Sequence, residues 1–155
     1  MRRTILVSAC LLGENCRYDG RTKRNQRIIE IAKGYNVIPV CPEILGGLST
    51  PREACEISEK NGMAVVEGNA QLLQVNSGRD ITYNLLKGAE RVLEIIGDER
   101  IEFAIFKERS PSCGVNQVVR NGKIIDGMGV TTAVLRREGI TIYSEESIGD
   151  EASFQ

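Results

Sequence analysis

The sequence predicts an α/β fold, a single domain with a mostly parallel β-sheet and helices on both faces. Short apolar runs typical of buried strands alternate along the chain with segments of helical periodicity. Such alternation is characteristic of parallel sheets whose strands are joined by helices. The 155 residues are enough for one domain with a sizeable core, and no linker, repeat or low-complexity segment divides residues 1–155.

The first part of the chain predicts two strands separated by a helix. Residues 4–9 are rich in Ile and Val, which predicts a buried strand. Apolar residues at helical spacing within residues 21–36 predict a short helix that ends near Gly34. Residues 37–40 predict a second strand, in which Pro39 argues against a central position in the sheet.

The middle of the chain carries the strongest helix signal. Residues 42–62 are rich in Pro and Gly and predict a loop, and residues 63–68 predict a strand. A long helix is predicted over residues 77–96, where Ser77 and Asp80 match a capping box. Its apolar residues share one helical face: Ile81, Leu85, Leu86, Ala89, Val92, Leu93 and Ile96.

The last part of the chain returns to short strands. Residues 101–106 predict a buried strand, and residues 117–126 predict a hairpin that turns at the Asn-Gly pair 121–122. A glycine turn leads into a helix within residues 127–139, and residues 140–144 predict the last strand. The whole order of elements predicts a Rossmann-like arrangement.

The composition is that of an ordinary globular protein, with one exception. Hydrophobic residues make up 41% and charged residues 26%, and the net charge is −1, so no global field attracts nucleic acid or an anionic membrane. The exception is that the chain contains no histidine. This excludes His-based triads, His metal ligands and the usual general base near neutral pH. Acid–base work must therefore use carboxylates, lysine, tyrosine, a thiol or water.

The cysteine usage indicates a reducing compartment. Five cysteines without close pairing, in a chain of this length, argue against a disulfide scaffold. No apolar run approaches the roughly 20 residues of a membrane span. The apolar stretch before Cys10 is shorter than the roughly 7–15 residues of a signal peptide core. We therefore expect a cytoplasmic protein with no membrane association.

Three of the cysteines follow predicted strands. Cys10, Cys41 and Cys113 each come just past a strand-like run. If these strands are parallel, the three thiols meet at the sheet edge where open α/β proteins bind ligands. The chain has no C-x₂₋₄-C pair of the kind that zinc sites use, and thiols delivered singly suit a metal or iron–sulfur centre. Cys16 and Cys55 are expected to be small buried or solvent-facing side chains instead.

Four motifs carry a family resemblance from residue 4 to about residue 143. In order they are SACLLGENCRYDG, PVCPEILGGLSTPR, GRDITYNLLKGAE and KERSPSCG. In these motifs the chain resembles the bacterial and archaeal family whose characterised members are 2-thiouracil desulfurases. After SPSCG the family usually has a longer insert, whereas VNQVVRNGKIIDG is short here. The resemblance therefore does not determine which residues form the wall of the pocket, and it does not determine the substrate.

The resemblance implies an enzyme, a desulfurase that converts 2-thiouracil to uracil and sulfide without net redox change. It implies a [4Fe–4S] cluster held by Cys10, Cys41 and Cys113, with a fourth iron free for the sulfur of a thiolated pyrimidine. It also implies dependence on cluster-assembly machinery. The acidic residue after CP corresponds to Glu43, and the first serine of SPSCG corresponds to Ser110.

The proposed chemistry needs a group that activates water. Iron bound to the substrate's sulfur would act as a Lewis acid. Glu43 is two residues from Cys41, and burial beside Ile44 and Leu45 would suit it to proton transfer. Ser110 would donate or relay a proton. From the residues alone Ser112 is equally plausible, and the resemblance favours Ser110.

Two further features have weaker functional interpretations. A basic run is expected to be a solvated face more often than an RNA contact: Arg17, Arg21, Lys23, Arg24 and Arg27. Arg17 and Arg52 flank the cysteine loops and are better pocket candidates. The Gly-Met-Gly segment 127–129 could present amides to an anion, but a turn into a helix is the better interpretation.

Two other classes of function remain open. The same cysteines could hold zinc or a labile cluster in a binding or redox-sensing module without turnover. A tRNA-directed sulfur enzyme is the third interpretation, although no Walker motif or ATP-pyrophosphatase loop is present.

Overall fold

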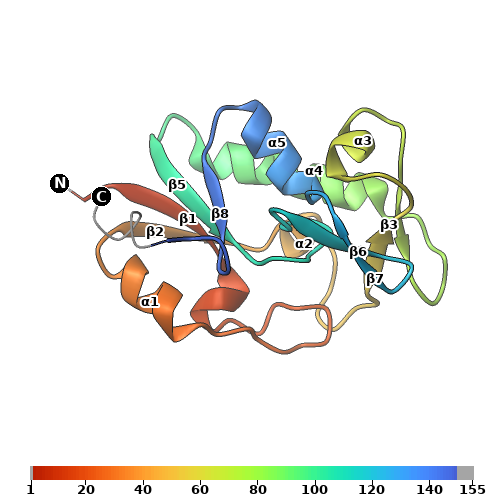
Figure 1. The fold of residues 1–155 in the computed structure, drawn as a ribbon, viewed down its shortest axis with the longest axis horizontal. Helices are drawn as coiled ribbons and strands as arrows, with labels where there is room; N and C mark the ends of the chain where they lie inside the picture. The colour runs from red at the N-terminus through yellow and green to blue at the C-terminus, as the bar shows by residue number, and fades with distance from the viewer. Residues whose placement is uncertain (1, 150–155) are drawn as a thin grey trace.

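The structure is a computed structural model that describes residues 2–149, and its centre is a four-stranded parallel sheet. The strand order is β2-β1-β5-β8 (Figure 1). The strands span Thr4–Ser8 (β1), Asn36–Val40 (β2), Ile101–Phe106 (β5) and Ile142–Ser144 (β8). All three pairings are parallel, which confirms the predicted α/β fold with a parallel sheet.

Helices cover both faces of this sheet, as predicted (Figure 1). Successive residues of a strand point to opposite faces, and the core divides accordingly. On one face Ile5 packs with Ile28 of α1 (Gln26–Ala32). On the other face Leu6 packs with Val92 of α4 (Thr82–Ile96) and with Leu135 of α5 (Val130–Arg137).

The edge position of β2 agrees with its proline. Pro39 pairs with Val7 of β1, and β2 is the first strand in the sheet order. Proline has no N–H to donate to a second neighbouring strand, so it is tolerated at a sheet edge. The sequence-based objection to a central position is confirmed.

Two small antiparallel sheets lie beside the main sheet. One pairs β3 (Cys55–Ile57) with β4 (Leu72–Gln74), and the other pairs β6 (Gln117–Arg120) with β7 (Lys123–Asp126). They share a core with α3 (Gly62–Val66) and with the first turns of α4. That core contains Ile57, Val65, Leu72, Ile81, Leu85 and Val118. We call residues 55–75 and 117–126 the small-sheet region.

Two predictions in this part of the chain are wrong. Residues 63–68, predicted as a strand, lie mostly in α3. The side chain of Asn61 accepts a hydrogen bond from the amide of Ala64 at 3.1 Å, and this N-cap starts a helix where the apolar run alone suggested a strand. Residues 42–62, predicted as a loop, contain β3 and a short helix α2 (Pro42–Leu45).

The predicted start of the long helix is also wrong. Helix α4 begins at Thr82, and the Ser77 hydroxyl donates to Gln74 instead of capping a helix. The carboxylate of Asp80 accepts from the amide of Thr82 at 2.9 Å, so Asp80 satisfies a first-turn amide of a helix that begins later. Of the two residues in the predicted capping box, it is therefore Asp80, and not Ser77, that forms a hydrogen bond with the start of the helix.

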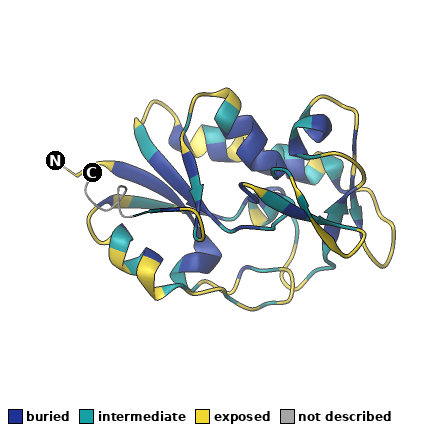
Figure 2. Cartoon of the chain, viewed as in Figure 1, coloured by how far each residue is buried: buried dark blue, intermediate teal, exposed yellow. Residues whose placement is uncertain are grey.

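The predicted hairpin is confirmed, and its turn is anchored. Asn121 and Gly122 both have positive φ, 54° and 71°, as a two-residue type I′ turn requires. The carboxylate of Glu56 accepts from both amides, at 2.7 Å and 3.3 Å. Figure 2 shows that the strands of the main sheet are mostly buried while the turns are exposed. Within residues 2–149, no helix combines the length and the apolar character needed to cross a membrane.

Candidate metal centre

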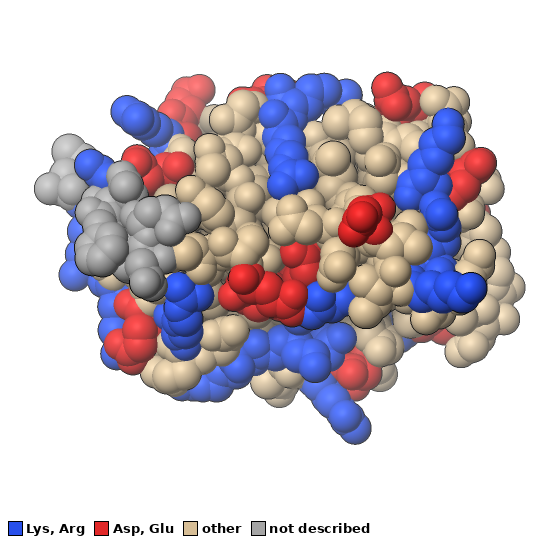
Figure 3. All heavy atoms as spheres, viewed as in Figure 1, with Lys and Arg blue, Asp and Glu red and all other residues tan. Residues whose placement is uncertain are grey.

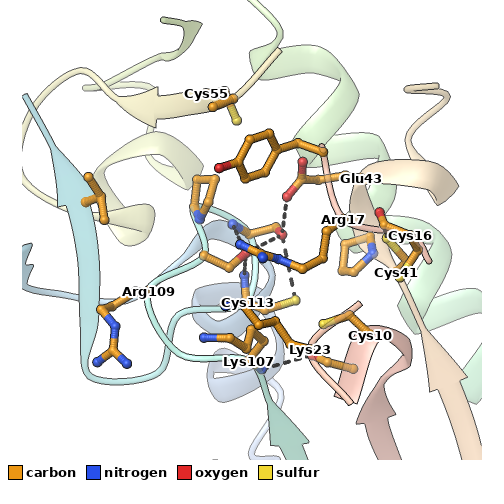
Figure 4. Close-up of a pocket in the computed structure, with 18 of the residues that line it drawn as sticks. Cys10, Cys16, Arg17, Lys23, Cys41, Glu43, Cys55, Lys107, Arg109 and Cys113 are labelled. Atoms are coloured by element: carbon orange, nitrogen blue, oxygen red, sulfur yellow. Dashed lines mark hydrogen bonds between the residues drawn. The ribbon is translucent and has the colours of Figure 1, made fainter. Parts of the chain in front are cut away.

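A cavity of about 560 Å³ lies at the carboxyl ends of the central strands, and all five cysteines line it (Figure 4). Cys10 lies in the 3₁₀ turn Ala9–Leu12 that follows β1, and Cys41 directly follows β2. Cys113 lies in the loop after β5. Because the strands are parallel, their ends share one edge of the sheet. The structure thus brings the three predicted thiols to the same cavity.

The local sequence explains why Cys41 stands at a turn. Pro42 occupies the first position of α2, where its fixed φ suits a helix start. The carbonyl of Cys41 accepts the first helical bond, from the amide of Leu45 at 3.0 Å. The chain therefore passes from strand to helix at Cys41, and Glu43 falls in the first turn beside it.

The buried carboxylate of Glu108 fixes the part of the loop that follows Cys113. Glu108 is 3% exposed, and one of its oxygens accepts from the amides of Val115, Asn116 and Gln117 at 2.7–3.0 Å. Burial alone would raise the pKa of Glu108, but these three amides outweigh it and hold the pKa below its usual value. The sequence analysis missed this residue, because a single Glu beside a strand end has no motif.

The start of α5 also forms hydrogen bonds with the loop that carries Cys113. The amides of Gly129, Val130 and Thr131 donate to the carbonyls of Gly114, Pro111 and Ser112 at 2.8–3.0 Å. The Thr132 hydroxyl also donates to the Cys113 carbonyl at 3.0 Å. These first-turn amides therefore bind the loop, and the segment 127–129 is a turn into a helix, as the sequence interpretation preferred.

Cys16 and Cys55 occupy different places in the cavity. Cys16 lies beside Cys41, and Cys55 lies apart on β3 (Figure 4). The Cys41 thiol donates to the Cys16 carbonyl at 3.7 Å. A hydrogen bond with the Cys10 thiol is the main cause that raises the pKa of Cys16 to about 11. Cys16 is therefore buried in contact with two of the three predicted ligands.

The thiols of Cys41, Cys55 and Cys113 are protonated at neutral pH when they are free. Burial raises the pKa of Cys113 to about 12 and is also the main reason that the pKa of Cys55 is raised. The hydrogen bond with Cys16, followed by burial, raises the pKa of Cys41. Thiolates at these positions require a cation or a metal to hold them in the charged form.

Glu43 forms a buried ion pair that the sequence analysis did not predict. Its carboxylate lies 3.0 Å from Nε of Arg52, and the two side chains are 12% and 5% exposed. The Arg52 guanidinium also donates to the carbonyls of Ser49 and Cys16, at 3.0 Å and 2.9 Å. Arg52, predicted only as a pocket residue, therefore ties Glu43 to the loop that carries Cys16.

Ser110 and Ser112 form a hydrogen-bonded chain that ends at Glu43. The Ser112 hydroxyl donates to Glu43 Oε2 at 3.1 Å, and the two serine hydroxyls are 3.0 Å apart. Ser110 Oγ also accepts from the amides of Ser112 and Cys113 at 3.2 Å and 3.1 Å. Both serines line the cavity, so the structure places both candidates in one network.

Basic side chains surround the thiols. Arg17 and Lys23 of the basic run line the cavity, together with Lys107 and Arg109. Lys107 pairs with Glu145 at 3.0 Å, and Arg109 pairs with Glu146. Figure 3 shows Lys and Arg side chains gathered along the lower edge of this face, beside a group of acidic ones. Arg17 also lies 3.8 Å from Asp19, so three of these four cations are already paired with carboxylates.

The donor set suits a cluster better than a single ion. Among the described residues 2–149, no group of three or more Cys, Asp or Glu side chains is arranged to hold one metal ion. Ligands of one ion must all contact the same atom, whereas each cysteine of an iron–sulfur cluster binds its own iron. Three thiols spread around a cavity of this size therefore fit a cluster.

The fold and the cavity define an α/β protein with a thiol-lined pocket at the carboxyl edge of its parallel sheet. The family model of 2-thiouracil desulfurase matches residues 5–147, and the chain belongs to this family, as the motifs predicted. The chain is 38% identical over 149 residues to the uncharacterized protein YbbK of Bacillus subtilis (strain 168), covering 94% of this chain and 98% of that protein. It also resembles the solved structure of the [4Fe-4S]-dependent thiouracil desulfidase TudS, with a TM-score of 0.80 and 36% identity, covering 94% of this chain and 92% of that one.

Proposed function

We propose that this chain is a [4Fe–4S]-dependent desulfurase that hydrolyses thiolated pyrimidines, with 2-thiouracil and water giving uracil and hydrogen sulfide. The observation that carries the proposal is that Cys10, Cys41 and Cys113 line one cavity together with the buried pair Glu43–Arg52. Family membership supports the same activity, and TudS, which is named for this cofactor and substrate, covers nearly the whole chain.

The three thiols of Cys10, Cys41 and Cys113 would hold the cluster. Held by these three thiols, the cluster would supply Lewis-acid activation of the substrate's carbon–sulfur bond. Side chains of the protein would carry out the acid–base steps. Cys55 would not be a ligand, because it lies across the cavity on β3.

Glu43 is the proposed general base. Its Oε1 is held by Arg52, so the carboxylate is fixed at the cavity edge. Its Oε2 accepts from the Ser112 hydroxyl, which lies 3.0 Å from the Ser110 hydroxyl. A proton from water can therefore be taken up at Glu43, and Ser110 can present its hydroxyl to the pyrimidine with Ser112 as the link between them.

The first test is the metal and sulfide content of protein purified without air. We expect iron and sulfide in a ratio of about 4:4, a broad visible absorption band, and sulfide release from 2-thiouracil. Cys10→Ser, Cys41→Ser and Cys113→Ser should each lose most of the iron. Cys55→Ser is the matched control, a buried thiol of the same cavity, and should retain it. Colourless protein with stoichiometric zinc would contradict the proposal and favour the binding module.

The second test separates the acid–base groups from the ligands. Glu43→Gln should keep its iron but lose about 100-fold in kcat, the lower end of the usual contribution of a general base. Ser112→Ala should lower kcat about as much as Ser110→Ala, because each breaks the same hydrogen-bonded chain. Full turnover in Glu43→Gln would remove this residue from the mechanism.

A further inference from the structure

The cavity has one side that the proposed chemistry does not use. Of the six large apolar side chains that are exposed among the described residues, three line this cavity: Tyr18, Val75 and Ile124, which are 39%, 54% and 58% exposed. Ala54 and Val119 also line it. We call these five residues the apolar wall. Exposed apolar side chains that gather at one place on a soluble protein mark a binding surface.

The apolar wall and the thiols come from different parts of the fold. Cys10, Cys41 and Cys113 follow strands of the main sheet. Val75 follows β4, while Val119 and Ile124 lie on the β6–β7 hairpin. Tyr18 belongs to the loop between the 3₁₀ turn Ala9–Leu12 and α1. The cavity is thus a thiol-bearing floor with a separate apolar side, which is the usual division between a reactive centre and a specificity surface.

The backbone of the apolar wall is fixed although its side chains are exposed. The Tyr18 carbonyl accepts from the amide of Arg52 at 2.7 Å, and the Val75 amide donates to Ala54 at 2.9 Å. The hairpin is held by Glu56 at its turn. A guanidinium bond from Arg120 to the Lys60 carbonyl, 3.0 Å long, holds it from the side. A surface ordered before binding loses little entropy when a ligand arrives.

We propose that the apolar wall receives the ring of the substrate, so that Tyr18, Val75 and Ile124 determine which thiolated pyrimidines the enzyme accepts. This inference rests on the proposed function. A pyrimidine has an apolar face and a polar edge, and the side chains of Val75 and Ile124 offer no hydrogen bonds that would compete for that edge. The edge is left to the serines and Glu43. The Arg17 guanidinium lies over the Tyr18 ring, 5.4 Å from its centroid, so the substrate would make its aromatic contact at the opposite face of this ring.

The hairpin of β6 and β7 brings Val119 and Ile124 to the cavity from the two strands of one turn. Contacts to the ring are the same before and during reaction, so they contribute uniform binding. Removing them should raise KM and leave kcat little changed.

The test uses Tyr18→Ala and Ile124→Ser in the cluster-loaded protein. We expect KM for 2-thiouracil to rise about 10-fold in each, the lower end for the loss of an apolar contact in a pocket. Uracil has the ring but no sulfur, and its inhibition constant should rise by the same factor. Iron content should be unchanged. Tyr83→Ala and Ile95→Ser are matched controls, since these side chains are 75% and 47% exposed and do not line the cavity.

The outcomes separate this inference from the proposed function. Wild-type protein that releases no sulfide would remove the proposed function, and uracil titrated calorimetrically into the full chain would still test the apolar wall. Weaker uracil binding in Tyr18→Ala and Ile124→Ser, with the controls unaffected, supports the inference. Unchanged KM and unchanged uracil affinity in both wall variants would overturn it, as would an equal loss in the controls.

Discussion

The main sheet and the small-sheet region contribute different things to one cavity. The main sheet supplies Cys10, Cys41 and Cys113 from strand ends that parallel pairing brings to one edge. The small-sheet region supplies Val119 and Ile124 from a hairpin. Helix α4 joins the two, since Leu85 packs in the small-sheet core while Val92 and Ile96 pack under the main sheet.

The difference shows how reactive and selective surfaces can be separated within one chain. Cys10 and Cys41 come within two residues of the ends of β1 and β2, and the Cys113 loop is held by the buried Glu108 and by α5, so moving any of the three thiols disturbs buried contacts. A hairpin turn is exposed and tolerates changes in length and sequence. The region proposed to hold a cluster is therefore expected to be rigidly specified, and the hairpin proposed to contact the substrate ring can change without moving the thiols.

The largest expected effect tests whether the small-sheet region is separable. Leu72 is fully buried in its core, and Leu72→Ala should lower the free energy of unfolding by about 3 kcal/mol through lost burial and a cavity. Iron per folded chain should be unchanged, because no thiol ligand depends on Leu72. Chemical denaturation and iron assay measure the two. Leu73→Ala, the half-buried neighbour on β4, should cost much less. Iron loss in Leu72→Ala would show that the regions are not distinct.

The next effect falls on the loop that carries Cys113. A Cβ at Gly129 would lie 2.5–2.8 Å from backbone atoms of Ser112 and Cys113, too close for any side chain. Gly129→Ala should therefore displace the loop, cost about 2 kcal/mol of stability and lower iron content. Gly34→Ala is the control, because its nearest contact would be 3.7 Å. Gly129→Ala with normal iron would mean that the loop can move without loss of the cluster.

A similar effect is expected at Glu108, with a distinctive pH dependence. The pKa of Glu108 is lowered in the folded protein, so its carboxylate stabilises the fold above the unfolded pKa of about 4.3, and this stability is lost as the pH falls through the folded pKa. Glu108→Gln should cost about 2 kcal/mol at neutral pH, since hydrogen bonds to a charged group are lost. The difference from wild type should shrink below about pH 4.

A counterpart to Glu108 nearer the surface lies next to the small-sheet region. Glu53 accepts from the amides of Asn76 and Ser77 at 3.2 Å and 2.8 Å, but it is less deeply buried than Glu108. Glu53→Gln should change stability less than Glu108→Gln, because water replaces the lost bonds. Denaturation curves at several pH values measure both variants. A pH-independent loss in Glu108→Gln would show that its charge is not what holds the Cys113 loop.

The main sheet could be predicted from the sequence because each strand is a continuous apolar run that ends in a loop. Residues 4–9, 37–40 and 101–106 have no competing signal. In the small-sheet region the hairpin 117–126 could be predicted from its Asn-Gly turn, whereas β3, α3 and β4 could not. β3 and β4 have three residues each, too short for a periodicity, and the run 63–68 is apolar in either a helix or a strand. The hydrogen bond that the Asn61 side chain accepts from Ala64 favours the helix over the strand, and it involves a single side chain.

The candidate site divides in the same way. The convergence of Cys10, Cys41 and Cys113 follows from parallel topology, so their spacing after strand-like runs was enough to predict it. The partners of these residues were not predictable. Arg52 meets Glu43, and Glu108 meets the amides of residues 115–117, only once the loops are folded. Long-range hydrogen bonds leave no local pattern in the sequence.

The smallest expected effect concerns the turn that presents the apolar wall. Gly122 has φ +71°, and Gly122→Ala should cost about 1 kcal/mol, the penalty for a side chain in the left-handed region. Asn121→Gly is the control, because glycine adopts the positive φ at that position without penalty. If the hairpin positions Ile124 against the substrate, Gly122→Ala should also raise KM for 2-thiouracil by a small factor, with iron content and kcat unchanged. Steady-state kinetics beside thermal unfolding measure both effects. A lower kcat or a loss of iron would show that the hairpin reaches the thiol floor and that the division between the two regions is wrong.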